Sequence, residues 1–218
     1  MARHAFALMP PHTRDSVARV RLALALALAV AACAPRLPAP PPEARQCEAT
    51  LDRLGVRWEP APVETAISSC EVADPVRVSA AGAQWNQPGI VACRFAVTLD
   101  SFTREDVDPL ARAYFGSDVR IVRHLGTYAC RTTRGGHESL HAVGEAIDIA
   151  GFVLADGTEI SVARDWHRAD AYGQFLRSVA RAACGRFSQV LTPDSDRDHD
   201  THIHLDAGPY RHCGVRSA

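Results

Sequence analysis

The chain has 218 residues, of which 47% are hydrophobic and 22% are charged, as in an ordinary globular protein and unlike a disordered one. This length is enough for one well-buried domain with a short accessory piece. The formal net charge is −1 at pH 7, and every one of the 24 Lys+Arg residues is an arginine. Because the basic surplus of a nucleic-acid-binding protein is missing, we expect no nucleic-acid partner.

The N-terminal segment has the pattern of an export signal. Several arginines precede the apolar run LALALALAVAAC, which is too short to span a bilayer and is followed by proline. We therefore predict a signal peptide over residues 1–32. Its end, Val-Ala-Ala-Cys at 30–33, resembles a bacterial lipobox, which implies that Cys33 is lipidated and becomes the mature N-terminus. The alternative is an ordinary signal cleaved nearby, with Cys33 incidental.

Residues 33–46 then read as the lipidated cysteine and a Pro-rich tether, since APRLPAPPPEA favours an extended polyproline conformation. Ala34 stands where aspartate would follow the cysteine of an inner-membrane lipoprotein. We expect a periplasmic protein that is held by its lipid anchor at the outer membrane.

Six cysteines remain after Cys33, and an even number in an exported protein indicates disulfides. They are Cys47, Cys70, Cys93, Cys130, Cys184 and Cys213. Six cysteines allow 15 pairings, of which we favour Cys184–Cys213 and Cys47–Cys70. A zinc site made of cysteines is disfavoured because the chain has no C-x-x-C.

Residues 47–218 form the predicted globular domain. Residues 76–80 and 90–99 read as strands or buried segments, and residues 108–116 as a helix with Asp108 at its N-cap, Pro109 at N1 and Gly116 after its end.

Two strands follow, at 118–126 and 127–133. Asp156-Gly157 indicates a hairpin between two alternating runs. Apolar residues at helical spacing predict a helix over 168–184, and residues 188–193 and 201–206 read as final strands. The order lacks a βαβ rhythm, so we predict an α+β fold with a mostly antiparallel central sheet, flanked by helices and stapled by disulfides.

His141 and Asp148 form the first part of a candidate metal site. On one helix, seven residues would separate them by about 10.5 Å along the axis, and on one strand they would face opposite sides. The chain must therefore bend between them, and Gly144 allows a bend. Asp148 lies in the apolar strand AIDIAGF, where an unpaired buried carboxylate is costly and a cation would relieve that cost.

His202 and His204 form the second part. On a strand, residues two apart face the same side, about 6.6–7 Å from each other. This spacing suits one ligand and one neighbour better than two ligands of one ion. His141, Asp148 and His204 then supply three N or O ligands and leave a fourth position open, as in catalytic zinc sites. Zinc would polarise a carbonyl and acidify its water, and His202 would move the proton.

These motifs resemble those of the LAS metallopeptidases, the group of lysostaphin-like and D-Ala-D-Ala carboxypeptidase enzymes. SLHAVGEAID, residues 139–148, fits their pattern Ser-x-His-x-x-Gly-x-Ala-x-Asp, and HIH fits their second motif, His-x-His. The resemblance implies one zinc ion on the three ligands above, with His202 catalytic. Arg131 resembles the arginine that grips substrate and stabilises the oxyanion. Ser139 and His199 are expected to contact substrate.

Most of residues 47–218 also resembles the bacterial extensin-like C-terminal domain, through GTYACR, SLHAVGEAIDIAGFVLADGTEISV, FLRSVARAACGRF and HDTHIHLD. Leu140 and Glu145 depart from the LAS pattern, which more readily has Glu and Asn there. We expect an exported zinc metallopeptidase whose partner is peptidoglycan. The alternatives are a non-catalytic cell-wall-binding lipoprotein that keeps the metal site and, less favoured, a zinc carrier. A His₂Asp set also accepts other divalent ions.

Overall fold

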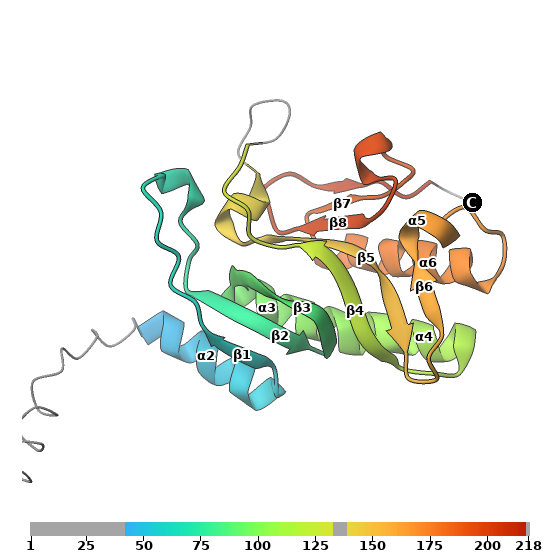
Figure 1. Ribbon diagram of the computed structural model, residues 1–218, viewed down its shortest axis with the longest axis horizontal. Helices are drawn as coiled ribbons and strands as arrows, with labels where there is room; N and C mark the ends of the chain where they lie inside the picture. The colour runs from blue at the N-terminus through green and yellow to red at the C-terminus, as the bar shows by residue number, and fades with distance from the viewer. Residues whose placement is uncertain (1–41, 133–138, 217–218) are drawn as a thin grey trace, which may run out of the picture. The chain divides into compact units, whose positions relative to one another are not determined.

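The computed structural model describes residues 42–132 and 139–216, shown in Figure 1. The predicted signal peptide, Cys33 and residues 34–41 of the tether lie outside these residues. Among the described helices none has the length and apolarity needed to cross a membrane.

One sheet of nine strands runs through the described residues, in the order β1-β2-β3-β4-β5-β8-β7-β9, with β6 paired to β5. Neighbours are antiparallel except for β3–β4 and β7–β9, which are parallel. The predicted α+β class with a mostly antiparallel sheet is therefore confirmed. The strands are β1 Arg57–Pro60, β2 Pro75–Ala81, β3 Ala83–Ala92, β4 Val119–Gly126, β5 Ala146–Leu154, β6 Glu159–Ser161, β7 Gln189–Leu191, β8 Ile203–Asp206 and β9 His212–Cys213.

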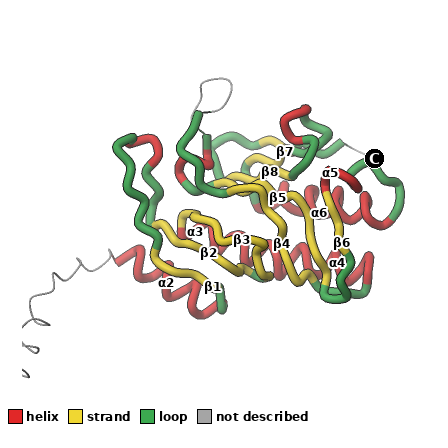
Figure 2. The backbone as a smooth tube through the Cα atoms, in the orientation of Figure 1, coloured by secondary structure: helices red, strands yellow, loops and turns green. Residues whose placement is uncertain are grey.

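The longer helices cover one face of this sheet and leave the other to loops and short turns (Figures 1 and 2). The α-helices are α2 Pro42–Leu54, α3 Cys93–Phe102, α4 Asp108–Phe115, α5 Val162–Asp165 and α6 Ala171–Arg186. A short π-helix, η2 Thr103–Val107, joins α3 to α4, and 3₁₀ helices form η1 Ser68–Cys70, η3 Leu140–Val143 and η4 Arg197–His199.

Helix α6 confirms the helix that the spacing of apolar residues predicted over residues 168–184. Asp170 accepts a hydrogen bond from the Tyr172 amide at its N-terminus, and Phe175, Leu176 and Val179 are buried in the core. Helix α2 begins at Pro42, a favourable first position, inside the stretch predicted as a tether.

Two local expectations need correction. Asp108 does not cap a helix, because α3, η2 and α4 run on continuously; its carboxylate instead accepts a hydrogen bond from the Val119 amide at 2.9 Å. Residues 127–132 of the predicted strand 127–133 form no strand apart from a single bridge residue, and residue 133 lies outside the described residues. Residues 90–99, predicted as a strand or buried segment, contain the end of β3 and the largely buried start of α3. The hairpin at Asp156-Gly157 and the left-handed Gly116 after α4 are confirmed.

Three disulfides connect the six cysteines: Cys47–Cys93, Cys70–Cys130 and Cys184–Cys213. The last was predicted, but the pairing Cys47–Cys70 is wrong. Helix α2 packs against α3, which places Cys47 beside the first residue of α3. Cys70 lies in η1, next to the segment that follows β4, and pairs with Cys130 there.

Candidate metal centre

Strands β5 and β8 place an acid and a histidine opposite each other on the face that the long helices leave free. Ile147 and Ile149 point into the hydrophobic core, so Asp148, between them, points to the other face. In β8, Ile203 and Leu205 are in the core in the same way. The strands pair with Asp148 directly across from His204.

A turn brings His141 to this pair. His141 lies in η3, and the next residue after the turn, Gly144, has a left-handed backbone with φ 69°. A Cβ at Gly144 would lie 2.7 Å from Val72 Cγ1 and 2.9 Å from the Ala92 amide nitrogen, so only glycine fits. The bend that the seven-residue spacing required is therefore made at Gly144.

His141, Asp148 and His204 form a compact buried triad. One ligand atom from each lies within 4.8 Å of the others. Asp148 Oδ1 is 3.3 Å from His141 Nε2 and 2.9 Å from His204 Nδ1, and the two histidine nitrogens are 3.3 Å apart. Two imidazole nitrogens and a carboxylate oxygen at this spacing fit a single divalent ion.

The second nitrogen of each histidine is also held. His141 Nδ1 donates its N–H to the carbonyl of Thr127, so Nε2 is the His141 nitrogen that faces the triad and would bind an ion. His204 Nε2 lies 3.1 Å from Asp206 Oδ2. Partners of this kind fix ring orientation and raise ligand basicity in metal sites.

The charges within the triad are strongly coupled. Burial acts against ionisation of Asp148, but hydrogen bonds from His141 and His204 outweigh it and hold the pKa of Asp148 far below its usual range. Burial also opposes a charge on His204, yet the carboxylates of Asp148 and Asp206 on its two sides raise its pKa to about 9. At neutral pH the metal-free His204 is thus protonated on both ring nitrogens. A metal ion must displace the proton on Nδ1, the nitrogen that faces the triad.

Two further histidines lie beside the triad. His202 Nε2 is 3.4 Å from Asp148 Oδ1, and burial lowers the pKa of His202 although the Asp148 charge opposes this. The ring of His199 lies 5.1 Å from that of His202 and 5.9 Å from that of His204, and its Nδ1 is 2.8 Å from Asp196 Oδ1. A neutral His202 next to the metal position can accept a proton.

The remaining candidates from the sequence lie farther out or differ in role. Ser139 is buried at the start of η3, where its carbonyl accepts a hydrogen bond from the Ala142 amide at 2.8 Å. Arg131 is exposed beside Cys130, and its guanidinium makes no hydrogen bond or ion pair with the part of the chain that the structure describes. The structure therefore brings His199 to the triad, but not Arg131.

Sequence reasoning missed Asp206 and the carbonyl of Thr127. Asp206 had a readable signal, because it follows His204 by two residues on the same strand and so shares its face. No sequence signal could have indicated Thr127, since it contributes a backbone carbonyl and not a side chain.

The Asp206→Asn substitution tests the role of this second carboxylate. We expect zinc to bind the variant about 10–100-fold more weakly, because His204 loses the anion that orients it and raises its basicity. Competition with a chromophoric chelator measures the change. Asp200→Asn, at an exposed position near the site, should leave the affinity unaltered; an equal loss in both variants would contradict the assignment.

Comparison with known proteins gives one match. A family model described as the extensin-like protein C-terminus matches residues 45–214. No curated protein and no solved structure matches the chain.

Proposed function

We propose that this chain, which belongs to the extensin-like protein C-terminus family, is an exported zinc-dependent peptidase that cuts peptidoglycan peptides or cross-links. The observation that carries the proposal is the buried triad of His141, Asp148 and His204, with His202 next to it. A purely structural role would not require a neutral histidine beside the ligands.

The donor set favours zinc. Three protein ligands, two of them imidazoles, match catalytic zinc sites, whereas structural zinc sites have four protein ligands. Zinc bound there would supply the Lewis acidity needed to hydrolyse an amide.

The side chains around the triad have distinct tasks in this reaction. His202 takes the proton from the attacking water at Nε2 and returns it to the leaving amine. The Thr127 carbonyl and Asp206 hold the two ligand histidines in orientation. The resemblance to the LAS enzymes gives Arg131 the task of binding an anionic group of the substrate.

The substrate class rests on the predicted location and on the motif. A signal peptide, the lipobox ending at Cys33 and three disulfides indicate the oxidising periplasm, where peptidoglycan is the abundant peptide polymer. SLHAVGEAID and HIH resemble LAS motifs. A lipid anchor at the outer membrane would keep the domain within reach of the cell wall.

The test uses residues 34–218 purified from the periplasm without a histidine tag, and the His202→Ala variant. We expect about one zinc ion per chain in both by plasma mass spectrometry, because three ligands remain in the variant. Muropeptides incubated with the parent and analysed by liquid chromatography and mass spectrometry should be cut, with kcat about 10²–10⁴-fold lower in the variant.

The matched control is His212→Ala, at an exposed histidine of β9, which should cut at the parental rate. A zinc-loaded parent that leaves a full panel of muropeptides intact would overturn the proposed reaction. A parent that takes up no metal even when zinc is supplied would overturn the metal site as well.

A further inference from the structure

A cavity of about 310 Å³ lies beside α6, and four of its lining residues are arginines. They come from three parts of the chain: the segment before α6 supplies Arg168, the helix supplies Arg177 and Arg181, and the C-terminal segment supplies Arg216. The triad contributes nothing to its lining, so the cavity is a separate feature of the fold.

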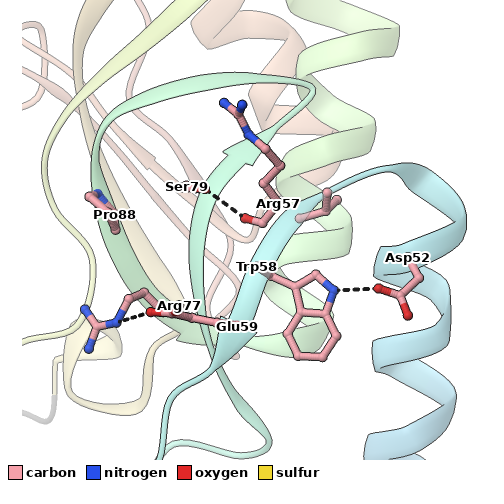
Figure 3. Close-up of a pocket in the computed structure, with 8 residues that line it drawn as sticks. Asp52, Arg57, Trp58, Glu59, Arg77, Ser79 and Pro88 are labelled. Carbon is pink, nitrogen blue, oxygen red and sulfur yellow. Dashed lines mark hydrogen bonds and ion pairs between the residues drawn. The ribbon is translucent and has the colours of Figure 1, made fainter. Parts of the chain in front are cut away.

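A larger cavity of about 410 Å³, at β1 and β2, provides a contrast (Figure 3). Its polar groups are mostly matched within the protein. Arg77 pairs with Glu59 at 3.2 Å, and the Trp58 indole donates to Asp52 at 2.9 Å. In the cavity beside α6, by contrast, arginines outnumber carboxylates among the lining residues.

Arg177 is fixed in place by backbone carbonyls, with no carboxylate partner among the described residues. Its guanidinium donates to the backbone carbonyls of Trp166 and Arg168, and the side chain is half-buried. Gly173, in the first turn of α6, makes room for this arrangement, because a Cβ there would overlap the Arg168 carbonyl oxygen and lie 2.8 Å from Arg177 Nη1. The position of this guanidinium is thus set by the fold before any ligand arrives.

The other charges around the cavity leave a positive surplus. Arg168 is matched by Asp165 and Asp170. Arg181 and Arg216 have exposed guanidinium groups with no ion pair or hydrogen bond to any described residue.

Asp194, the acid among the lining residues, is already engaged. It accepts hydrogen bonds from the Trp166 indole at 3.1 Å and from the Arg216 amide at 3.2 Å. Arg177, Arg181 and Arg216 therefore face one hollow in which Asp194 is the only carboxylate among the described lining residues.

From this arrangement we infer that the cavity binds a phosphate monoester. Guanidinium forks suit phosphate oxygens, which accept several charge-assisted hydrogen bonds at once. A carboxylate offers two oxygens in one plane, whereas a phosphate monoester offers three in different directions and can meet arginines that approach from both α6 and the C-terminal segment. The cavity is also larger than a phosphate group alone, so it has room for part of the attached molecule. This inference is independent of the proposed peptidase activity.

The experiment titrates the zinc-loaded domain with glycerol 3-phosphate by calorimetry, and with vesicles of phosphatidylcholine alone or mixed with phosphatidic acid, a lipid with a phosphate monoester headgroup, by sedimentation. We expect glycerol 3-phosphate to bind and the affinity to fall as salt is raised. In the Arg181→Gln/Arg216→Gln variant the affinity should fall by about tenfold or more. Arg94→Gln/Arg120→Gln removes the same charge at two exposed positions outside the cavity and should bind like the parent.

The two arms separate the sources of the phosphate. Sedimentation with vesicles that contain phosphatidic acid, lost in Arg181→Gln/Arg216→Gln, assigns the site to a lipid headgroup, whereas binding of glycerol 3-phosphate alone assigns it to a soluble ester. Unchanged binding in that variant, no binding by the parent, or equal binding of glycerate, the carboxylate analogue, would overturn the inference. Both variants change exposed side chains, and equal melting temperatures check that they fold.

Discussion

Zinc is expected to bind the Asp148→Asn protein at least about a hundredfold more weakly than the parent, a larger loss than that for a residue that only orients a ligand. Asn keeps the shape of the side chain but removes the anion, whose Oδ1 lies within 3.4 Å of nitrogens of His141, His202 and His204. Equilibrium dialysis followed by plasma mass spectrometry measures the change.

The folded state of this variant has to be checked with the metal removed, because breaking a buried ion pair is itself destabilising. Circular dichroism and intact disulfides would show that the fold remains. Parental zinc affinity in a folded Asp148→Asn protein would mean that the ion binds elsewhere, and the triad would then lose its assigned role.

Removing the Cys70–Cys130 disulfide, by Cys70→Ala together with Cys130→Ala, is expected to lower the free energy of unfolding by about 4 kcal/mol. The bond closes a loop with a sequence separation of 60 residues. It also fastens the segment that orients His141, through the Thr127 carbonyl and through the Ala129 amide, which donates to the His141 carbonyl at 3.1 Å. Zinc affinity should therefore fall too.

The matched control removes Cys184–Cys213, whose sequence separation is 29 residues. Its loss should lower the free energy of unfolding by about 3.5 kcal/mol. It should not loosen the segment that holds His141, so zinc affinity should stay at the parental value. Urea denaturation gives the stabilities and chelator competition gives the zinc affinities. If both double variants bound zinc equally well, the link between Cys70–Cys130 and the ligand would be disproved.

The geometry of the triad was largely readable from the chain. Strand alternation puts Asp148 and His204 away from the core, and the spacing from His141 to Asp148 demands a bend, which Gly144 makes. Both predictions depend only on neighbouring residues: side chains alternate along a strand, and glycine permits a turn. The structure agrees with both.

Features that depend on distant packing were harder to predict. The partner of Cys47 is decided by α2 packing against α3, a contact that no local pattern reveals. Residues 127–132 have strand-forming side chains, but the segment leaves the sheet after Gly126 and is held by Tyr128, whose hydroxyl donates to the Cys70 carbonyl at 3.2 Å. Tertiary contacts thus override the propensity of that segment.

The Cys47–Cys93 bond has a mechanical consequence for a protein anchored at its N-terminus. If residues preceding α2 tether the domain, as the sequence predicts, tension between membrane and cell wall enters the fold at Pro42. Such a pull can unwind only residues 42–46 before it reaches Cys47, where a covalent bond passes it to Cys93 at the start of α3. The load then falls on the helix that packs against β2 and β3, so the disulfide protects α2 from being stripped off the domain under tension.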